Sequence, residues 1–476
     1  MTGQILEQFQ GDILVLSLSN PPFNLLSAQM RAAVLHKLEA GFAAPSVTGI
    51  VLKGEGALFS RGVPVAEYAH DPKPPQVDEI CARIAQAPKP VVMALHGLVL
   101  SAGFELALAA HGRVARASAR MGLPEVTLGL PPGAGGSQRL PRLAGPGIAL
   151  RLALSGKLAR ASELEKTQVI QELVGDEQEV GPESQPGDEA PVKEAIALAR
   201  SLAKTGHWKT PRDLPMSLRA SRQFQEYLGE TRRAMSRAGD VLNDIVDCIE
   251  ASQLLPLVQG LDFEAARFAD RLRDPSGRAE RHLAAARQIA AIEATLARGR
   301  PGPVAHLAIL GGARQVAEMA VLMLSLNRRT SLLSGDPARD AALLADVRTQ
   351  LAAMVEAGTL SQAQCDAHLA RLDALPGVEA LGDVDLVFDT GGLTLPETVS
   401  QKRGGLWVIL DDPGRNLAEV IAGRRAVLGE DASIATLAMR RPVLSAPLAE
   451  ISVVAGPEAQ AISTLTPLLA RDTRPV

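Results

Sequence analysis

Short apolar runs alternate with segments of helical periodicity in the first quarter of this chain. Residues 13–18, 48–52 and 91–95 are apolar and partly β-branched, whereas residues 27–42 and 104–110 carry apolar side chains at helical spacing. Strands that alternate with helices pack as layers, because each element buries its apolar face only against another layer. The pattern therefore predicts an α/β fold for this part of the chain.

The same alternation returns in the last third of the chain. Apolar runs at 307–310 and 330–333 flank Gly311, Gly312 and a helical segment at 316–326. Strand, glycine turn, helix and strand form the opening of a dinucleotide-binding fold. The sequence thus predicts a second α/β domain.

The region between the two alternations differs in composition. Residues 172–192 are acidic, rich in Pro, Gly and Gln, and typical of a loop. From about residue 190 to residue 298, Ala, Leu, Arg and Glu recur at helical periods. We predict three regions, which are an α/β domain at 1–190, a helical linker at 191–300 and a second α/β domain at 301–476.

Charge and cysteine usage exclude several classes of protein. A net charge of -4 over 476 residues leaves no broad cationic field for nucleic acid or an anionic membrane. Cys81, Cys248 and Cys365 are too far apart for a C-x-x-C pair and suit packing in a reducing compartment. There is no signal-like start, no apolar run of the roughly 20 residues that span a bilayer, and no S-K-L-type ending. We expect a cytoplasmic protein.

Two glutamates stand inside segments rich in small residues. Glu105 ends the run 100–105, and Glu125 precedes the glycine-rich run 132–139. The small residues Ala102 and Gly103 let a backbone amide approach a substrate closely, and the helix that follows aims its positive end at a developing anion. Each glutamate alone is more often a capping or solvated residue. Together they indicate an acid/base pair beside main-chain donors.

The linked motifs resemble the enoyl-CoA hydratase/isomerase (crotonase) family. The run 89–97, the turn that ends in Glu105 and the segment 123–140 match its signatures in order and spacing, over about residues 5–175. The resemblance implies a crotonase domain, a ClpP-like spiral of ββα units, which takes acyl-CoA substrates without metal or redox cofactor. It further implies that Glu105 acts mainly as base and Glu125 mainly as proton donor to the α-carbon. The thioester oxygen would meet the amides of Val63 and Ala102, beside Gly103.

The first domain departs from the family pattern near both oxyanion donors. Ala102 stands where glycine is usual, so a positive φ there would be restricted by its Cβ. Arg61 and Pro64 replace the usual small residue and aspartate. Proline cannot donate a hydrogen bond, but the required amide belongs to Val63, and Pro64 only favours an extended conformation there.

The last third resembles the NAD-binding domain of 3-hydroxyacyl-CoA dehydrogenase, and the chain order is similar to the bifunctional β-oxidation protein. The expected glycine turn keeps Gly311 and Gly312, but two of its three glycines are replaced, by Ala313 and Val316. We therefore interpret it as a degenerate, truncated Rossmann-like domain.

Two further positions of that family are also changed. Ser334 stands where an acidic residue binds the ribose, with Asp336 a displaced candidate, and Ala438 stands at the catalytic histidine. No histidine follows His368, and the chain ends where the family's helical, dimerising domain would begin. We expect that NAD binding and dehydrogenase activity are lost.

Three functions remain open from the sequence. The first is hydration of trans-2-enoyl-CoA in fatty-acid β-oxidation. The second is isomerisation of the enoyl double bond, for which one glutamate suffices. The third is a catalytically weakened CoA-binding or scaffold subunit that pairs with a β-oxidation enzyme. Acyl chain length and oligomeric state, including a homo-oligomer, stay open.

Overall fold

The structure is a computed structural model that forms two compact units, Met1–Ile292 and Glu293–Arg474. Most of the predicted helical linker falls inside the first unit, while the three-region division stays a prediction. The residues that the structure describes are 3–69, 73–175, 189–208, 210, 218–234, 240–296, 304–312, 315–396, 399, 405–410, 416–429, 432–439, 449–455 and 464–465.

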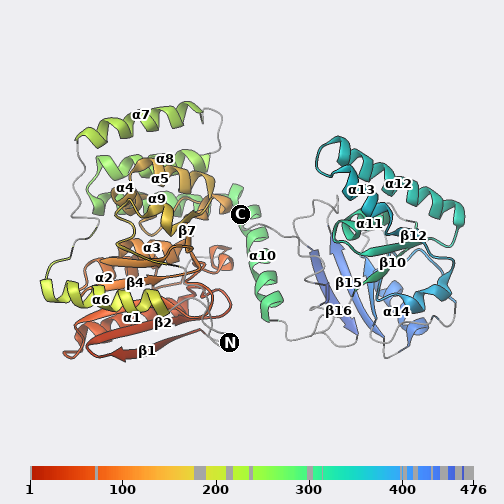
Figure 1. The fold of residues 1–476 in the computed structure, drawn as a ribbon, viewed down its shortest axis with the longest axis horizontal. Coiled ribbons are helices and arrows are strands. Elements are labelled where there is room, and N and C mark those ends of the chain that lie inside the picture. Colours follow the sequence, from red (N-terminus) through yellow and green to blue (C-terminus); the bar gives the residue numbers. More distant parts are fainter. Residues whose placement is uncertain are drawn as a thin grey trace. The chain divides into compact units, whose positions relative to one another are not determined.

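A six-stranded sheet forms the base of the first unit (Figure 1). β1 pairs antiparallel with β2, and every other pair is parallel. The strands predicted at 13–18, 48–52 and 91–95 are confirmed as β2, β3 and β4. In spatial order the strands are β1 (Gln4–Gln10), β2 (Ile13–Ser19), β3 (Gly49–Gly54), β4 (Val91–Leu95), β6 (Gly112–Arg116) and β9 (Glu172–Val174).

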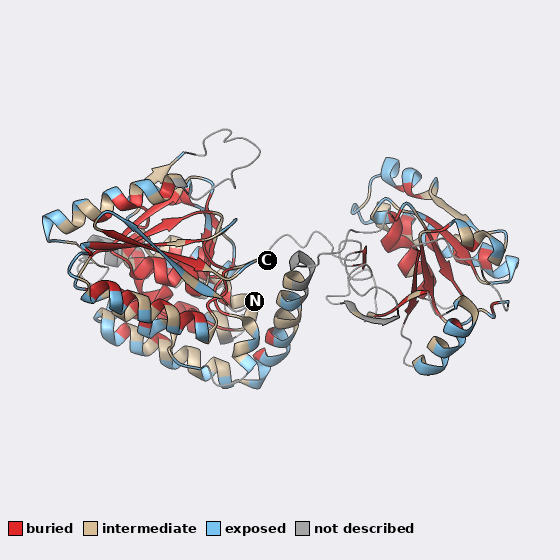
Figure 2. Ribbon diagram, turned by 90° about the horizontal axis from the view of Figure 1, so that it is seen from below, coloured by how far each residue is buried: buried red, intermediate tan, exposed pale blue. Residues whose placement is uncertain are grey.

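The central strands are apolar on both faces because helices cover both faces (Figure 2). Ile13 and Val15 pack in one apolar cluster with Ala199 of α6 (Glu189–Thr205). Leu14 and Leu16 belong to the larger cluster on the opposite face. That cluster includes residues of α1 (Ala28–Ala43), α2 (Val77–Ala85) and α3 (Ala102–Ala109).

A second layer above this sheet carries the segments of interest. β5 (Leu98–Leu100), β7 (Arg120–Gly122) and β8 (Ala159–Arg160) form a three-stranded sheet. Short 3-10 helices η1 (Val65–Ala69) and η2 (Pro124–Leu128) follow the loop at residues 60–63 and β7. The layer continues with α4 (Gly136–Ala144) and α5 (Pro146–Ser155).

The helices after residue 189 pack onto this first unit. α6 contacts β3, β4 and β6, and α8 and α9 contact α4. The helices predicted at 263–272 and 279–296 are confirmed within α9 and α10. Their bounds are α7 (Leu218–Ala234), α8 (Asp240–Leu254), α9 (Leu257–Arg273) and α10 (Arg278–Leu296).

The second unit has the strand order of a doubly wound dinucleotide-binding fold. Its sheet runs β12-β11-β10-β13-β14-β15-β16, parallel except for the last strand, with apolar clusters on both faces. The predicted Rossmann-like architecture is confirmed. The elements are β10 (His306–Leu310), α11 (Gln315–Ser325), β11 (Arg329–Leu333), α12 (Pro337–Glu356), α13 (Gln362–Leu369), β12 (Leu372–Ala374), β13 (Leu386–Asp389), β14 (Leu406–Leu410), α14 (Leu417–Leu428), β15 (Ser433–Met439) and β16 (Ala449–Ala455).

Two further sequence expectations concern single features. Cys81, Cys248 and Cys365 are free and buried, which suits packing residues. Among the helices in the described part of the chain, none combines the length and the apolar character that crossing a bilayer requires.

Candidate active site

Two loops of the first unit lie side by side beneath the start of α3. The Ser60 amide donates to the Leu98 carbonyl at 3.1 Å, and the Leu100 amide donates to the Ser60 carbonyl at 2.9 Å. A Cβ built on Gly103 would lie 2.9 Å from the Ser60 Cβ, and Gly62 has a φ of +88°. Small residues are therefore needed where the loops touch.

The backbone conformation at Ala102 is compatible with its Cβ. Ala102 is the first residue of α3 and has no positive φ. The positive φ of this turn, 55°, falls on the preceding residue, Ser101. Alanine is thus accommodated without backbone strain, and the expected restriction does not arise.

The two predicted oxyanion donors are available. Among the hydrogen bonds of the described residues, none uses the amide of Val63 or of Ala102. Both residues line one cavity. Ala102 opens a helix, where the first amides have no acceptor within the helix and carry the positive end of its dipole. The arrangement can receive an anionic oxygen.

Glu105 is buried on the first turn of α3 and is held by main-chain donors. Its Oε1 accepts hydrogen bonds from the Ala134 amide at 2.8 Å and the Gly136 amide at 2.9 Å. Burial raises the pKa of Glu105, while these two amides and Arg139 lower it in part. The two amide donors favour the ionised carboxyl and act against the effect of burial.

Glu125 is equally buried on η2 but lacks such support. In the described part of the chain, neither of its carboxyl oxygens has a hydrogen-bond partner. Burial, and next the negative charge of Glu105, raise the pKa of Glu125 to about 8. The Ser101 hydroxyl and the amide of Glu125 itself lower this pKa in part, while burial favours the neutral, protonated form. The two glutamates therefore differ in the hydrogen-bond donors that each meets.

The cavity between these groups has a volume of about 950 Å³. Val63, Ala102, Glu105 and Glu125 all line it, so the structure brings four of the five predicted site residues together. Gly103 is not among the lining residues and lies behind Ala102, against Ser60.

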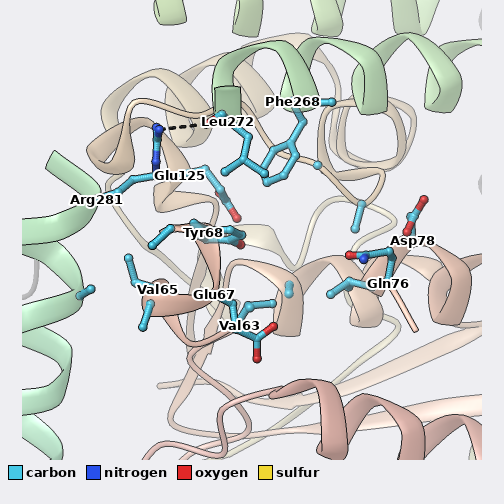
Figure 3. Close-up of a pocket in the computed structure, with 18 of the residues that line it drawn as sticks. Val63, Val65, Glu67, Tyr68, Gln76, Asp78, Glu125, Phe268, Leu272 and Arg281 are labelled. Atoms are coloured by element: carbon cyan, nitrogen blue, oxygen red, sulfur yellow. Dashed lines mark hydrogen bonds between the residues drawn. The ribbon is translucent and has the colours of Figure 1, made fainter. Parts of the chain in front are cut away.

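The remaining cavity wall was not predicted from the sequence. Figure 3 shows Tyr68 from η1 with Phe268 and Leu272 from α9 around Glu125. The rings of Tyr68 and Phe268 meet edge to face, with 5.8 Å between their centroids. Burial and the nearby carboxyls raise the pKa of Tyr68, so its hydroxyl stays protonated. Helical periodicity indicated α9, but periodicity alone does not indicate the partner of a helix.

A buried arginine at the edge of the cavity fixes η1. Arg31 is 1% exposed and forms an ion pair with Glu67 at 2.9 Å. Its guanidinium also donates to the carbonyls of Leu26, Lys73 and Pro75. These bonds tie α1 to the loop before α2 and hold Tyr68 at the cavity.

The second unit keeps one feature of a dinucleotide turn and fills the space beside it. Gly311 follows β10 with a φ of +100°. A Cβ on Gly312 would lie 2.0 Å from the Arg339 Nε, and the Arg339 Nη2 donates to the Gly312 carbonyl at 3.0 Å. A guanidinium thus covers a peptide that a dinucleotide turn leaves bare for the pyrophosphate. Ala313 lies outside the described residues, and Val316 is buried in the apolar core.

The other positions of that fold are used structurally. The Asp336 side chain accepts the Ala338 amide at 2.9 Å and caps α12. The Ser334 amide donates to Asp340 at 2.6 Å. Ala438 lies inside β15, paired with Glu450 of β16. We derive no chemistry through NAD.

Comparison with known proteins agrees with the first unit. A family model described as enoyl-CoA hydratase/isomerase matches residues 8–238. A "Probable enoyl-CoA hydratase" of Bacillus subtilis is 32% identical over 237 residues, which cover 48% of this chain and 86% of that protein. The chain therefore belongs to the enoyl-CoA hydratase/isomerase family.

Two relatives that are longer than this chain also match it, one over 167 residues and one over 406 residues. The "Peroxisomal bifunctional enzyme" of Danio rerio is 40% identical over 167 residues, which cover 35% of this chain and 23% of that protein. The "Peroxisomal fatty acid beta-oxidation multifunctional protein AIM1" of Arabidopsis thaliana is 26% identical over 406 residues, which cover 81% of this chain and 54% of that protein. The chain is thus distantly related, over most of its length, to multifunctional β-oxidation proteins and spans only part of each.

Proposed function

We propose that the first unit adds water to trans-2-enoyl-CoA thioesters, with Glu105 as base and Glu125 as acid. One observation carries the proposal, which is the asymmetry of the two buried carboxyls. Glu105 accepts two main-chain amides of the loop at 134–137, whereas burial raises the pKa of Glu125 to about 8 although the Ser101 hydroxyl and its own amide lower it in part. A base and an acid of different proton affinity in one cavity suit a reaction that moves two protons.

The proposed reaction balances within these groups. A water oxygen bonds to the β-carbon while the carboxylate of Glu105 takes one water proton. The electrons of the double bond move to the thioester oxygen, where the amides of Val63 and Ala102 stabilise the enolate. Collapse of the enolate takes the proton of Glu125 onto the α-carbon. The product is a 3-hydroxyacyl-CoA, and proton exchange with water restores both carboxyls.

An absorbance assay tests this proposal directly. Hydration of crotonyl-CoA removes the conjugated enone-type absorbance in the ultraviolet. We expect turnover by the full chain, a fall of about 100-fold or more for Glu125→Gln and for Glu105→Gln, and little change for the exposed control Glu165→Gln. If wild type and both variants are equally inert on short, medium and long acyl chains, the proposal fails.

The assay also separates hydration from double-bond isomerisation. An isomerase moves one proton between two carbons and needs one carboxyl. Retention of 3-enoyl to 2-enoyl conversion in Glu105→Gln, together with no hydration by wild type, would favour the isomerase. Co-purification with a thiolase or dehydrogenase and no turnover would favour a scaffold subunit.

For the second unit we propose no redox role. The guanidinium of Arg339 over Gly312, and the use of Asp336 as a helix cap, support loss of NAD binding. An NADH fluorescence titration of the full chain is expected to show no saturable binding. A cytoplasmic location stays a prediction, and the relatives with "peroxisomal" in their names do not decide it.

A further inference from the structure

A third buried carboxyl lies behind the cavity and is not used by the proposed reaction. Glu264, on α9, is 1% exposed and does not line the cavity. It accepts hydrogen bonds from the amide of Gly135 and from the hydroxyl of Ser137, and it accepts the Ser137 amide at 2.8 Å. A buried carboxyl with three donors is a fixed structural anchor.

The donors to Glu264 alternate with the donors to Glu105 along one loop. The amides of Ala134 and Gly136 point to the Oε1 of Glu105, and the amides of Gly135 and Ser137 point to Glu264. Successive amides can point in opposite directions here because Gly135 has a φ of +102°. The loop at residues 134–137 is therefore clamped between two carboxyls.

This loop is also the first turn of α4, which is fixed from its other side. The Gln138 side chain donates to the Cys248 carbonyl of α8 at 2.6 Å. The Arg139 side chain turns back and donates to the Ala134 carbonyl at 2.7 Å. With α8 and α9 packed on α4, the position of the loop depends on the helical region as much as on the crotonase segment.

The orientation of Glu105 depends on this clamp. Its Oε1 is held by the loop, and no hydrogen bond in the described part of the chain uses its Oε2, so Oε2 is left to serve the cavity. If the loop turned, both donors to Oε1 would move together, because their peptides alternate along the chain with the two peptides that Glu264 restrains.

We propose that Glu264 is a positioning residue, which holds the loop at 134–137 so that Glu105 keeps two amide donors and presents its second oxygen to the substrate water. The proposal rests on the function proposed for Glu105. It assigns a role in that reaction to a residue of the helical region, outside the motifs that identify the family.

Several titratable groups surround this pair and enter any pH dependence. Burial, and next the charge of Glu105, raise the pKa of Glu264 to about 8. The groups that face Glu105 or Glu264 are Tyr68 of η1, Asp78 and Cys81 of α2, Glu125 of η2, Arg139 of α4 and Cys248 of α8. A variant that changes only Glu264 leaves all of them in place.

The decisive variant is Glu264→Gln. A glutamine side chain has the same shape but turns an NH₂ group toward donors at 135 or 137, so the clamp loosens. The amides at 134 and 136 then hold Glu105 less well, and its pKa rises. We expect the acid limb of kcat/KM to move to higher pH and kcat to fall by about 10- to 100-fold. Asp262→Asn, exposed on the same helix, is the control and should change neither.

The outcomes separate positioning from two other roles. If Glu264 acted only through the charge of its ionised form, loss of that charge would lower the pKa of Glu105 and move the acid limb to lower pH. If its role were only structural, the folded variant would show a lower Tm with an unchanged pH profile. Either result overturns the proposal.

A readout without turnover keeps this test independent of the proposed reaction. The infrared band of the protonated Glu105 carboxyl is assigned by its loss in Glu105→Gln and followed across pH in the full chain. Its midpoint should be higher in Glu264→Gln than in wild type. A protein that hydrates no enoyl-CoA but shows this shift retains the positioning role and loses the proposed function, whereas an unchanged or lower midpoint removes the positioning role.

Discussion

Two side chains of the same chemistry meet different donors in the cavity, because only Glu105 accepts main-chain amides from another segment of the chain. Glu105 lies at the start of α3 and is within reach of the loop at 134–137, whereas Glu125 lies on a short 3-10 helix, where the Ser101 hydroxyl and its own amide lower the pKa of its carboxyl in part. The difference follows from backbone placement. A sequence motif can therefore indicate the two glutamates but not the hydrogen-bond donors that set the pKa of each.

The buried acid Glu125 should make the stability of the first unit depend on pH. Its pKa is about 8 in the folded chain against an ordinary value of 4.5. The folded state holds this proton more tightly, so the stabilisation is complete below the unfolded pKa and is lost as pH rises through the folded pKa. We expect the free energy of unfolding to fall between about pH 5 and 9, and Glu125→Gln to remove more than about 1 kcal/mol of that fall.

Fluorescence can isolate this unit within the full chain. The chain has two tryptophans, so in a Trp407→Phe background Trp208, which contacts His111, reports the first unit alone. Thermal unfolding at both pH values compares this background with the same chain carrying Glu125→Gln. Glu264 has a raised pKa as well, so part of the pH dependence should remain. Equal slopes in both proteins would show that Glu125 is not a buried acid of raised pKa.

The contact between the two donor loops should be sensitive to one methyl group. In Gly103→Ala the added Cβ would lie 2.9 Å from the Ser60 Cβ, so the loops must separate and move the amides of Val63 and Ala102 apart. Loss of one oxyanion donor costs about 100-fold or more in rate, and we expect a fall of about 10-fold or more in kcat. Gly147→Ala is the control, because its new Cβ meets only Tyr227 at 3.9 Å. A Gly103→Ala enzyme with wild-type kcat would exclude this packing constraint.

At the scale of elements, the sequence predicted the strands that are apolar on both faces and missed the strands that are largely exposed. β2, β3 and β4 are continuous apolar runs and were identified, whereas β1 is an edge strand with five of its seven residues exposed in a row from Leu6 and was not. Within the acidic stretch predicted as a loop, β9 (Glu172–Val174) joins the sheet edge by backbone pairing with β6. Pairing of this kind leaves little trace in side-chain pattern.

The packing of the helices after residue 189 was the main feature that the sequence did not predict. Their periodicity was evident, but the cavity wall from α9 and α10 depends on which surface each helix covers. Ala195 and Ala199 on α6 are fully buried against Val15 and Val92, a contact between segments about a hundred residues or more apart in the chain. Single-sequence patterns indicate an amphipathic helix and leave its partner open.

Packing of α6 on the sheet should be essential for the first unit. Ala199→Asp places an unpaired charge against Ile13 and Val15, and we expect a loss of about 3 kcal/mol or more in the free energy of unfolding. Ala197→Asp adds the same charge to the same helix at an exposed position and should cost little. Urea unfolding followed by Trp208 fluorescence compares the two. Equal stability of these variants would mean that α6 does not cover the sheet.

At the scale of the whole chain, the sequence predicted the order of folds and not the extent of the active unit. The crotonase-like segment, the helices and the Rossmann-like sheet follow one another as expected. However, the cavity is lined by residues from Arg31 to Ile289, so its walls continue almost to the end of α10. The helices that were interpreted as a linker contribute directly to the candidate site. The motifs noted in the sequence end near residue 175 because they record the glycine turns and glutamates, although the family model matches residues 8–238.

Two truncations test whether the helices belong to the active unit. A chain that ends after Leu296 keeps every residue of the cavity wall and both clusters of the first unit, and we expect it to hydrate crotonyl-CoA with a kcat/KM close to that of the full chain. A chain that ends at residue 190 lacks α7 to α10 and nearly all of α6, which exposes Val15 and Val92 on the sheet and removes Phe268, Leu272 and Glu264. It should aggregate or remain inactive, because an apolar sheet face of this size is not stable in water. Both chains are compared by gel filtration and by the hydration assay. Full activity in the shorter chain would show that the helices only connect the two units, and the positioning role of Glu264 would fall with it.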